Sequence, residues 1–397
     1  MTMKTERLNL LADIQTGPFG SQLHKEDYVA VGTPIVTVEH LGNRFFTEQN
    51  LPMVSGEDKE RLNKYVLKEG DIVFSRVGSV DRCSYVDAAH DGWMFSGRCL
   101  RVRPNEQLDA LYLYYYFCLE ETKQYVRNIA VGATMPSINT KLLGEVPITF
   151  PSIIQQKRIA QFLSAIDDQI ETNCKINDNL EQQAQAFFQE LFIDNADPEW
   201  AIGTISDLGT VVGGSTPSKA KPEYYTETGI AWITPKDLSI NKSKFISHGK
   251  NDITELGLKN SSATIMPEGT VLFSSRAPIG YIAIAAGEVT TNQGFKSIVP
   301  KPEIGTAFVY YFLKHNLPII EGMASGSTFK EVSGSTMKGV PAVIPDTDRI
   351  TRFNDFCTPI FSHQRILEEQ NQSLAALRDN LLPKLMSGEI DVSDIQI

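Results

Sequence analysis

The chain has 397 residues, of which 42% are hydrophobic and 21% charged, and its formal net charge is −11. This composition excludes wholesale disorder and provides enough apolar residues for two or three domains. The N-terminal stretch lacks the features of a signal peptide, and no apolar run approaches the roughly 20 residues that span a bilayer, so we expect a cytoplasmic protein.

Residues 1–151 predict a first globular domain of mixed structure. Short apolar runs bounded by Gly, Pro or Asn, such as residues 33–39 and 71–76, are typical of strands. A Tyr-rich stretch, residues 109–129, predicts a helix near the end of this domain. Because strands and helices do not alternate regularly, the pattern favours an α/β fold of the mixed α+β kind over a βαβ series.

Residues 152–194 predict a long helix. No Gly or Pro occurs from Gln155 to Phe192, and a 4-3 spacing joins Ile159, Leu163, Ile166, Ile170, Asn173, Asn177, Leu180, Ala184, Phe187 and Leu191. This is a heptad seam with two polar members near its middle. At 1.5 Å per residue the helix would be about 57 Å long.

Residues 195–346 predict a second globular domain that repeats the first. "LKEGDIVFSR" returns as "MPEGTVLFSSR", and "LYLYYYF" returns as "AFVYYFL", in the same order along the chain. The period is near 195 residues, which is too long for a solenoid. The chain therefore carries a duplicated unit, each copy made of a domain and a helix.

Residues 347–388 predict the second long helix, followed by a tail at 389–397. Its seam runs through Phe353, Phe356, Ile360, His363, Leu367, Gln370, Leu374, Leu377 and Leu381, and Pro359 is expected to kink or restart it. The two helices either pair with each other or pack on their own domains, and the matching heptads favour pairing. The expected pairing residues are Ile159, Leu163, Ile166, Ile170, Leu180, Phe187, Leu367, Leu374, Leu377 and Leu381.

The sequence offers no catalytic or metal-binding signature. Phosphate-binding glycine loops, zinc-protease helices and nucleophile elbows are missing from it, and the five cysteines are scattered, which predicts reduced thiols and no zinc site. The six isolated histidines are interpreted as structural, and Asp167-Asp168 as a solvated helix face. What remains is a set of polar loops, such as "GGSTPSKAKPEYY" and "TNQGFK", whose side chain types can read base edges and hold phosphates.

Several motifs together resemble the specificity subunits of Type I restriction-modification systems. In the second half they are "GGSTPSKAKPEYY", "GIAWITPKDLS", "SSATIMPEGTVLFSSRAPIGYIAIA", "TTNQGFKSIVP", "SGSTFKEVS" and "LRDNLLPKLMSGEI"; the first half matches more loosely through "TGPFGSQLHKEDY", "EGDIVFSRVGS" and "GATMPSINTKLL". One departure is "FPSIIQQKRIA", where the family often has Pro-Pro and Glu-Gln before the first long helix.

The resemblance implies two target-recognition domains, each reading half of a bipartite asymmetric double-stranded DNA site, and two antiparallel helices related by a pseudo-two-fold axis. It implies a non-catalytic chain without cofactors of its own. Two modification subunits would bring S-adenosylmethionine, and motor-nuclease subunits would bring ATP and Mg²⁺.

Candidate DNA contacts follow from this implied function. They are Lys25, Arg44, Arg76, Arg82, Lys219, Lys236, Arg276, Lys296, Ser327 and Thr328. Arg276 is the foremost of these, although it could equally be a structural arginine paired with a buried carboxylate. The net acidity is compatible with DNA binding, because most of the excess acid lies in residues 151–197 and 347–397 and partner subunits would complete the DNA clamp.

Three other readings stay open at this point. The chain could serve another phage-defence or orphan DNA methylation complex, it could be a stand-alone DNA-binding regulator, or it could be a scaffold that binds only protein.

Overall fold

The computed structural model describes residues 2–19, 22–326 and 330–392. The chain divides into two compact units. The first unit comprises Met1–Gln169 with Leu374–Ile397, and the second comprises Ile170–Ser373. Each unit contains one globular domain and part of both long helices, and each is described by itself.

The first unit is built on a four-stranded antiparallel sheet of order β2-β9-β6-β7. A smaller sheet of order β3-β5-β4-β8 and the pair β1-β10 complete its strands. The strands are β1 (Lys4–Arg7), β2 (Ala12–Thr16), β3 (Tyr28–Val29), β4 (Thr33–Val36), β5 (Met53–Val54), β6 (Ile72–Ser75), β7 (Cys83–Tyr85), β8 (Met94–Phe95), β9 (Cys99–Pro104) and β10 (Pro147–Phe150).

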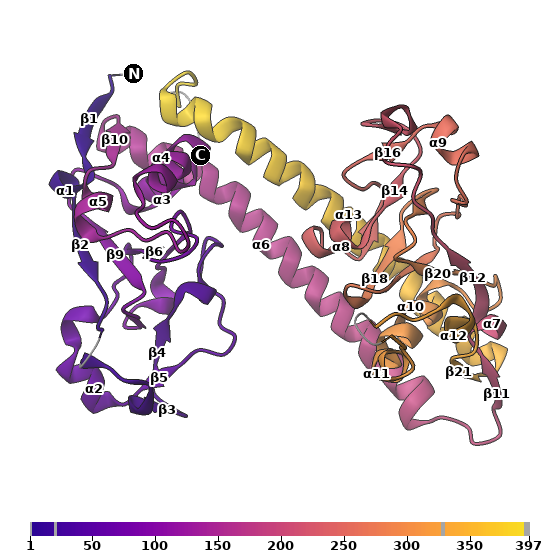
Figure 1. The fold of residues 1–397 in the computed structure, drawn as a ribbon. Helices are drawn as coiled ribbons and strands as arrows, with labels where there is room; N and C mark the ends of the chain where they lie inside the picture. Colours follow the sequence, from indigo (N-terminus) through magenta and orange to yellow (C-terminus); the bar gives the residue numbers. More distant parts are fainter. Residues whose placement is uncertain (1, 20–21, 327–329, 393–397) are drawn as a thin grey trace. The chain divides into compact units, whose positions relative to one another are not determined.

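In the first unit, α3 and α4 lie next to the start of α6, and α2 lies by the smaller sheet (Figure 1). The helices of this unit are α1 (Leu8–Leu11), α2 (Gly56–Arg61), α3 (Ala110–Cys118), α4 (Glu120–Ile129) and α5 (Thr140–Gly144), with short 3-10 turns η2 (Lys25–Asp27), η3 (Val38–His40), η4 (Asn63–Tyr65) and η5 (Ala88–His90). The single helix expected over 109–129 is therefore two. The backbone leaves the helical region at Leu119 (φ −58°, ψ 132°), between α3, with five of its nine residues buried, and α4, with two of its ten residues buried.

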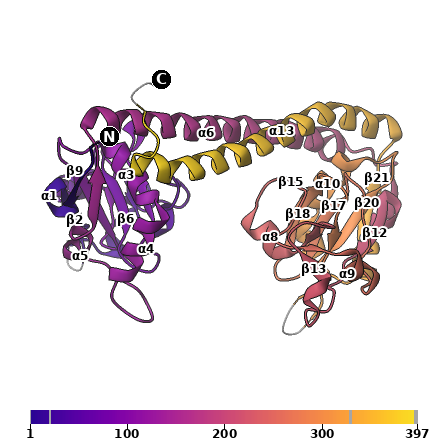
Figure 2. The same cartoon turned by 90° about the horizontal axis from the view of Figure 1, so that it is seen from above.

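The second unit repeats this arrangement. Its main sheet has the order β12-β20-β17-β18-β15 (Figure 2). Its first four strands therefore match β2-β9-β6-β7 in order and direction. The strands are β11 (Ala201–Thr204), β12 (Gly209–Gly213), β13 (Tyr225–Thr226), β14 (Trp232–Ile233), β15 (Phe245–Ile246), β16 (Asp252–Ile253), β17 (Val271–Ser275), β18 (Ile279–Ala285), β19 (Thr290–Thr291), β20 (Lys296–Pro300) and β21 (Pro341–Ile344). The predicted duplication and mixed α+β class are confirmed.

Short helices of the second unit occupy places equivalent to those of the first. They are α7 (Ile205–Leu208), η7 (Pro222–Tyr224), α8 (Pro235–Ile240), α9 (Glu255–Lys259), α10 (Thr306–His315), α11 (Leu317–Gly322) and α12 (Gly334–Lys338). The buried residues of α10, among them Phe308, Tyr311 and Leu313, form a core with β17, β18 and both long helices. Burial of these large side chains, at about 25 cal/mol per Å² of apolar surface, fixes the domain to the helices.

The long helices are α6 (Ile153–Gln189), which continues as a π-helical turn η6 (Glu190–Asp194), and α13 (Thr347–Ser387). In the second unit Asn173 contacts Asn371, Asn177 contacts Glu368, and Phe187 contacts Phe356. In the first unit, buried Ile159 and Leu163 share a core with Leu382 and Leu385. In the second unit the residue numbers rise on one helix as they fall on the other, so the predicted antiparallel pairing is confirmed.

Burial along α6 follows the predicted seam. Ile159, Leu163 and Ile166 are buried, Ile170, Leu180 and Phe187 are half-buried, and the polar member Asn173 is only 2% exposed. This seam therefore faces the protein interior as expected.

The seam predicted for α13 is partly wrong. Leu367 is buried and Leu374 and Leu381 are half-buried, but Leu377 is 47% exposed and His363 is also exposed. At every second position of the seam, the inward-facing residue is the one that follows the predicted residue. These inward-facing residues are Cys357, Gln364, Asn371 and Arg378, in place of Phe356, His363, Gln370 and Leu377. Polar side chains occupy three of these four places, so a search for apolar residues selects the neighbouring position instead.

The break expected at Pro359 is not observed, because α13 continues through it. Proline lacks the N–H that would bond to the carbonyl of Asp355 one turn earlier. Both residues are exposed, so water can satisfy that carbonyl.

Candidate nucleic-acid interface

Two loops cross at the end of the main sheet in each unit, and a glycine allows the crossing. A Cβ atom on Gly17 would lie 2.2 Å from the backbone oxygen of Ser96, and one on Gly214 would lie 2.0 Å from the backbone oxygen of Asn292. Real side chains do not fit at such distances. The loop after β2 or β12 is therefore held against the loop before β9 or β20 in the same way in both units.

In the second unit, several polar side chains contact one another at this crossing. Thr216 donates a hydrogen bond to Gln293 Oε1, and Lys296 Nζ lies 3.4 Å from the backbone oxygen of Gln293. Lys296 Nζ also lies 3.6 Å from Glu331 Oε1, and a terminal guanidinium nitrogen of Arg276 lies 3.6 Å from Glu331 Oε2. The side chains of Arg276 and Glu331 are 37% and 38% exposed, so the carboxylate that partners Arg276 is not buried.

The first unit has the same backbone with different side chains. The N–H of Ile138 bonds to the carbonyl of Arg76, as the N–H of Val332 bonds to the carbonyl of Ser275. By this equivalence Ser137 stands where the second unit has Glu331. The Arg76 guanidinium donates to the backbone oxygen of Gly97 at 3.1 Å and lies 5.9 Å from the ring of Phe19, which is 62% exposed.

The remaining candidates are more dispersed. Lys219, Lys236 and Arg82 are exposed, and the Arg82 guanidinium passes close to Gly42. Lys25 begins the turn η2. Ser327 and Thr328 lie outside the described residues.

Arg44 has an intramolecular role. Its guanidinium donates to Asp168 at 2.6 Å and to Ser164 Oγ at 2.8 Å, and its side chain is 15% exposed. Next to it, Asp167 accepts hydrogen bonds from Tyr115 at 2.6 Å and from Arg378 at 2.7 Å. The interpretation of Asp167-Asp168 as a solvated face was wrong for Asp167, whose side chain is 11% exposed, whereas the Asp168 side chain is 58% exposed. Through these contacts the two carboxylates join the first domain and α13 to α6.

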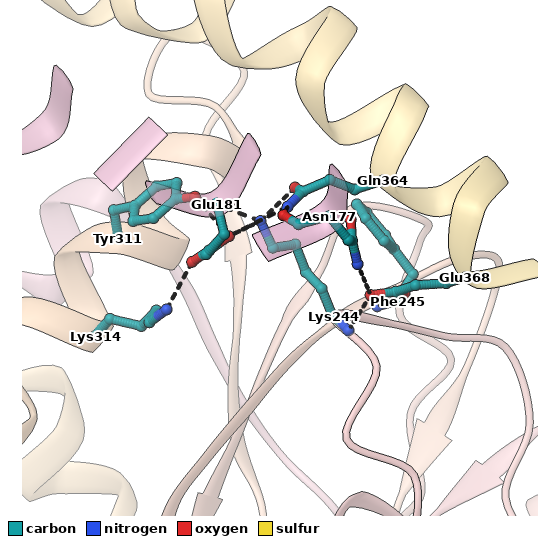
Figure 3. A network of polar contacts seen from close by, with 8 residues as sticks. All are labelled: Asn177, Glu181, Lys244, Phe245, Tyr311, Lys314, Gln364 and Glu368. Carbon is teal, nitrogen blue, oxygen red and sulfur yellow. Dashed lines mark hydrogen bonds and ion pairs between the residues drawn. The ribbon is translucent and has the colours of Figure 1, made fainter. Parts of the chain in front are cut away.

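The second unit carries an equivalent polar junction around Lys244 (Figure 3). The carbonyl of Lys244 accepts from the N–H of Ile284, as the carbonyl of Arg44 accepts from the N–H of Tyr85, so Lys244 and Arg44 are counterparts. Lys244 Nζ pairs with Glu181 of α6 and donates to Gln364 of α13 at 2.5 Å.

Other groups complete this junction. Glu181 also accepts from Lys314 at 2.7 Å and from Tyr311 at 2.9 Å. The backbone N–H groups of Lys244 and Phe245 donate to Glu368 at 2.8 and 3.0 Å. The domain is therefore joined to both helices by charged and neutral hydrogen bonds.

The pKa values show how the charges at the junction are held. Burial disfavours the ionised form of Glu181, but Lys244 and Lys314 outweigh it and lower the pKa of this carboxyl from 4.5 to about 2. Burial also lowers the pKa of Lys244, in spite of the attraction of Glu181. Both pKa values are lowered, which favours the charged form of Glu181 and disfavours the charged form of Lys244. The attraction of Glu181 therefore does not offset the burial of the lysine.

Sequence reasoning missed the residues of the Lys244 junction, and it gave Arg44, Asp167 and Asp168 of the first unit's junction other roles. The repeated Tyr-Tyr pair, Tyr114-Tyr115 and Tyr310-Tyr311, was the available signal, since the second tyrosine of each pair binds a helix carboxylate. In the described part of the chain no group of three or more His, Cys, Asp or Glu residues could hold a metal ion. The described helices include none that is long and apolar enough to cross a membrane.

Comparison with known proteins agrees with the duplicated architecture. The family model of the Type I restriction modification DNA specificity domain matches residues 2–182 and again residues 198–374. The chain is similar to the Type I restriction enzyme HindI specificity subunit of Haemophilus influenzae, with 24% identity over 90% of this chain and 94% of that subunit. It is also 43% identical to the MjaIX specificity subunit of Methanocaldococcus jannaschii, over 41% of this chain and 38% of that subunit.

A solved structure shares the fold. The crystal structure of a Type I restriction-modification system S subunit from M. genitalium aligns over 97% of this chain and 96% of its own, with a TM-score of 0.63 and 18% identity. Because the family model covers most of the chain in two copies, the chain belongs to the Type I restriction modification DNA specificity domain family.

Proposed function

We propose that this chain is the DNA sequence-specificity subunit of a Type I restriction-modification complex, and that each domain reads one half of a bipartite, asymmetric double-stranded site. One observation carries the proposal. The two units share a loop crossing and a backbone framework, yet the exposed side chains on it differ, with Glu331 in one unit and Ser137 in the other. Equal scaffolds with unequal polar faces suit two different base sequences.

The chain supplies recognition, and its partners supply the chemistry. Two modification subunits would bring the methyltransferase site with S-adenosylmethionine, and motor-nuclease subunits would bring ATP and Mg²⁺. The net charge of −11 is compatible with this division, because positive charge for the phosphates can come from those subunits. The assembly would act in the cytoplasm, where the cellular DNA is.

Methylation mapping of a host that carries the assembled complex tests the proposal. We expect methylation at a two-part asymmetric motif, and no methyl transfer by the purified chain alone with S-adenosylmethionine. Methylation without any sequence preference, or methyl transfer by the chain alone, would contradict the proposal.

The paired helices would set the gap between the half-sites. The end of α6 is a poor place to lengthen the spacer, because Leu191 and Phe192 just beyond it are buried in the second unit's core. Seven residues should instead be added to both helices, between Asp168 and Asn173 in α6 and between Asn371 and Arg378 in α13.

A heptad in each helix preserves the seam and adds about 10 Å of rise. This corresponds to about three base pairs of B-DNA. We expect the mapped half-sites to keep their bases while the gap grows. Changed bases with an unchanged gap would refute the assignment of reading to the domains and spacing to the helices.

A further inference from the structure

Two cations lie near the carboxylate of Glu331, but neither is close enough to form a short hydrogen bond with it. Arg276 and Lys296 each approach one of its oxygens to 3.6 Å, whereas a charge-assisted hydrogen bond is about 2.7–2.9 Å long. The Glu331 side chain is also 38% exposed. Both oxygens therefore keep the capacity to accept a hydrogen bond from a ligand.

The backbone beneath Glu331 is firmly placed. Its N–H donates to the carbonyl of Ser325 at 2.9 Å, and its carbonyl accepts from Ser325 at 3.1 Å. The next residue, Val332, is fully buried and donates to the carbonyl of Ser275 at the end of β17 at 3.0 Å. The carboxylate thus projects from a segment bonded to the main sheet, as a reading group requires.

A carboxylate in this place is costly for a surface that only grips phosphates. Arg276 and Lys296 would attract the DNA backbone by themselves, and an acid between them weakens that attraction. The cost is offset if the carboxylate accepts a hydrogen bond from a base. In the major groove cytosine presents only the N4 amino donor, adenine pairs its donor with the N7 acceptor, and guanine and thymine present acceptors that would repel an acid.

The geometry points to Glu331 as the residue that reads a cytosine in the half-site of the second domain, with Arg276 and Lys296 holding its carboxylate toward the groove. This inference rests on the proposed function and adds one specificity-determining residue to it. In the first domain the equivalent Ser137 hydroxyl donates to the backbone oxygen of Val131 at 3.2 Å and carries no charge, so the other half-site is free of this requirement.

The test uses the assembled complex with Glu331→Gln, and Glu303→Gln as the matched control. Glu303 is an exposed carboxylate beyond the opposite end of β20. Methylation mapping gives the motif of each complex, and binding to duplexes with one base pair changed gives the discrimination. Glu331→Gln should relax a single cytosine in one half-site, reducing its preference by about tenfold, while the other half-site is unchanged.

Four results bear on the inference in different ways. A Glu331→Gln complex that folds with an unchanged thermal midpoint and keeps the wild-type motif at every position would overturn it, as would an equal change with Glu303→Gln. The converse variant, Ser137→Glu, should add a cytosine preference in the other half-site. If the wild-type complex itself shows no bipartite motif, the proposed function fails, and this is seen before any variant is compared.

Discussion

Replacement of Glu181 by a neutral residue should destabilise the second unit more than replacement of Lys244 by a neutral residue. The Glu181 side chain is 22% exposed and faces Lys244 and Lys314. Its pKa shift from 4.5 to about 2 corresponds to about 3 kcal/mol of stabilisation of the ionised form. We therefore expect Glu181→Gln to lower the free energy of unfolding of the second unit by about 3 kcal/mol.

The comparison variant Lys244→Met should cost only about 1 kcal/mol. Glu181 keeps its bonds to Lys314 and Tyr311 in this variant. The methionine also retains an apolar stem against Phe361, whose ring centre lies 4.3 Å from the lysine nitrogen. The double variant should cost less than the sum of the two single changes, because the same ion pair is removed in both.

Native-state hydrogen exchange followed by mass spectrometry provides the assay, since it reports each unit separately. Peptides from β17 and β18 should lose protection in Glu181→Gln, and peptides from β6 in the first unit should serve as the internal control. A larger loss of protection in Lys244→Met than in Glu181→Gln would refute the argument, and so would equal losses in both units.

Three further predictions use changes at other positions or in solvent. Gly214→Ala should abolish recognition of one half-site in methylation mapping, because its Cβ would meet the Asn292 backbone, whereas Gly213→Ala, with open space around its Cβ, should leave both half-sites intact. Leu367→Ala should cost about 2–5 kcal/mol in urea unfolding and Leu377→Ala less than about 0.5 kcal/mol, since the first side chain is 5% and the second 47% exposed; equal costs would contradict the observed seam. Because the pKa of Glu181 is depressed on folding, its stabilisation is complete above pH 4.5 and is lost as the pH falls toward 2. In urea unfolding at a series of pH values, the free energy of unfolding of the second unit should therefore fall less between pH 4.5 and 2 in Glu181→Gln than in the wild type.

The sequence by itself determined the features that repeat or have a regular period. The duplication, the mixed fold class and the α6 seam through Ile159, Leu163 and Asn173 could all be predicted, because equal sequences fold alike and a heptad spacing keeps one face of a helix covered. The resemblance to specificity subunits also came from motif order along the chain. The polar loops predicted a recognition surface without indicating which of their side chains contact one another.

Only the tertiary structure decided the polar contacts. Gln364, Asn371 and Arg378 face inward on α13 because residues of α6 or of the neighbouring domain satisfy their hydrogen bonds. Glu331 meets Arg276 and Lys296 because three segments far apart in the sequence come together at one end of the sheet. A polar side chain is stable in a buried seam, or poised on a surface, only through a partner at a specific distance and direction, and the position of that partner depends on the fold of the whole unit.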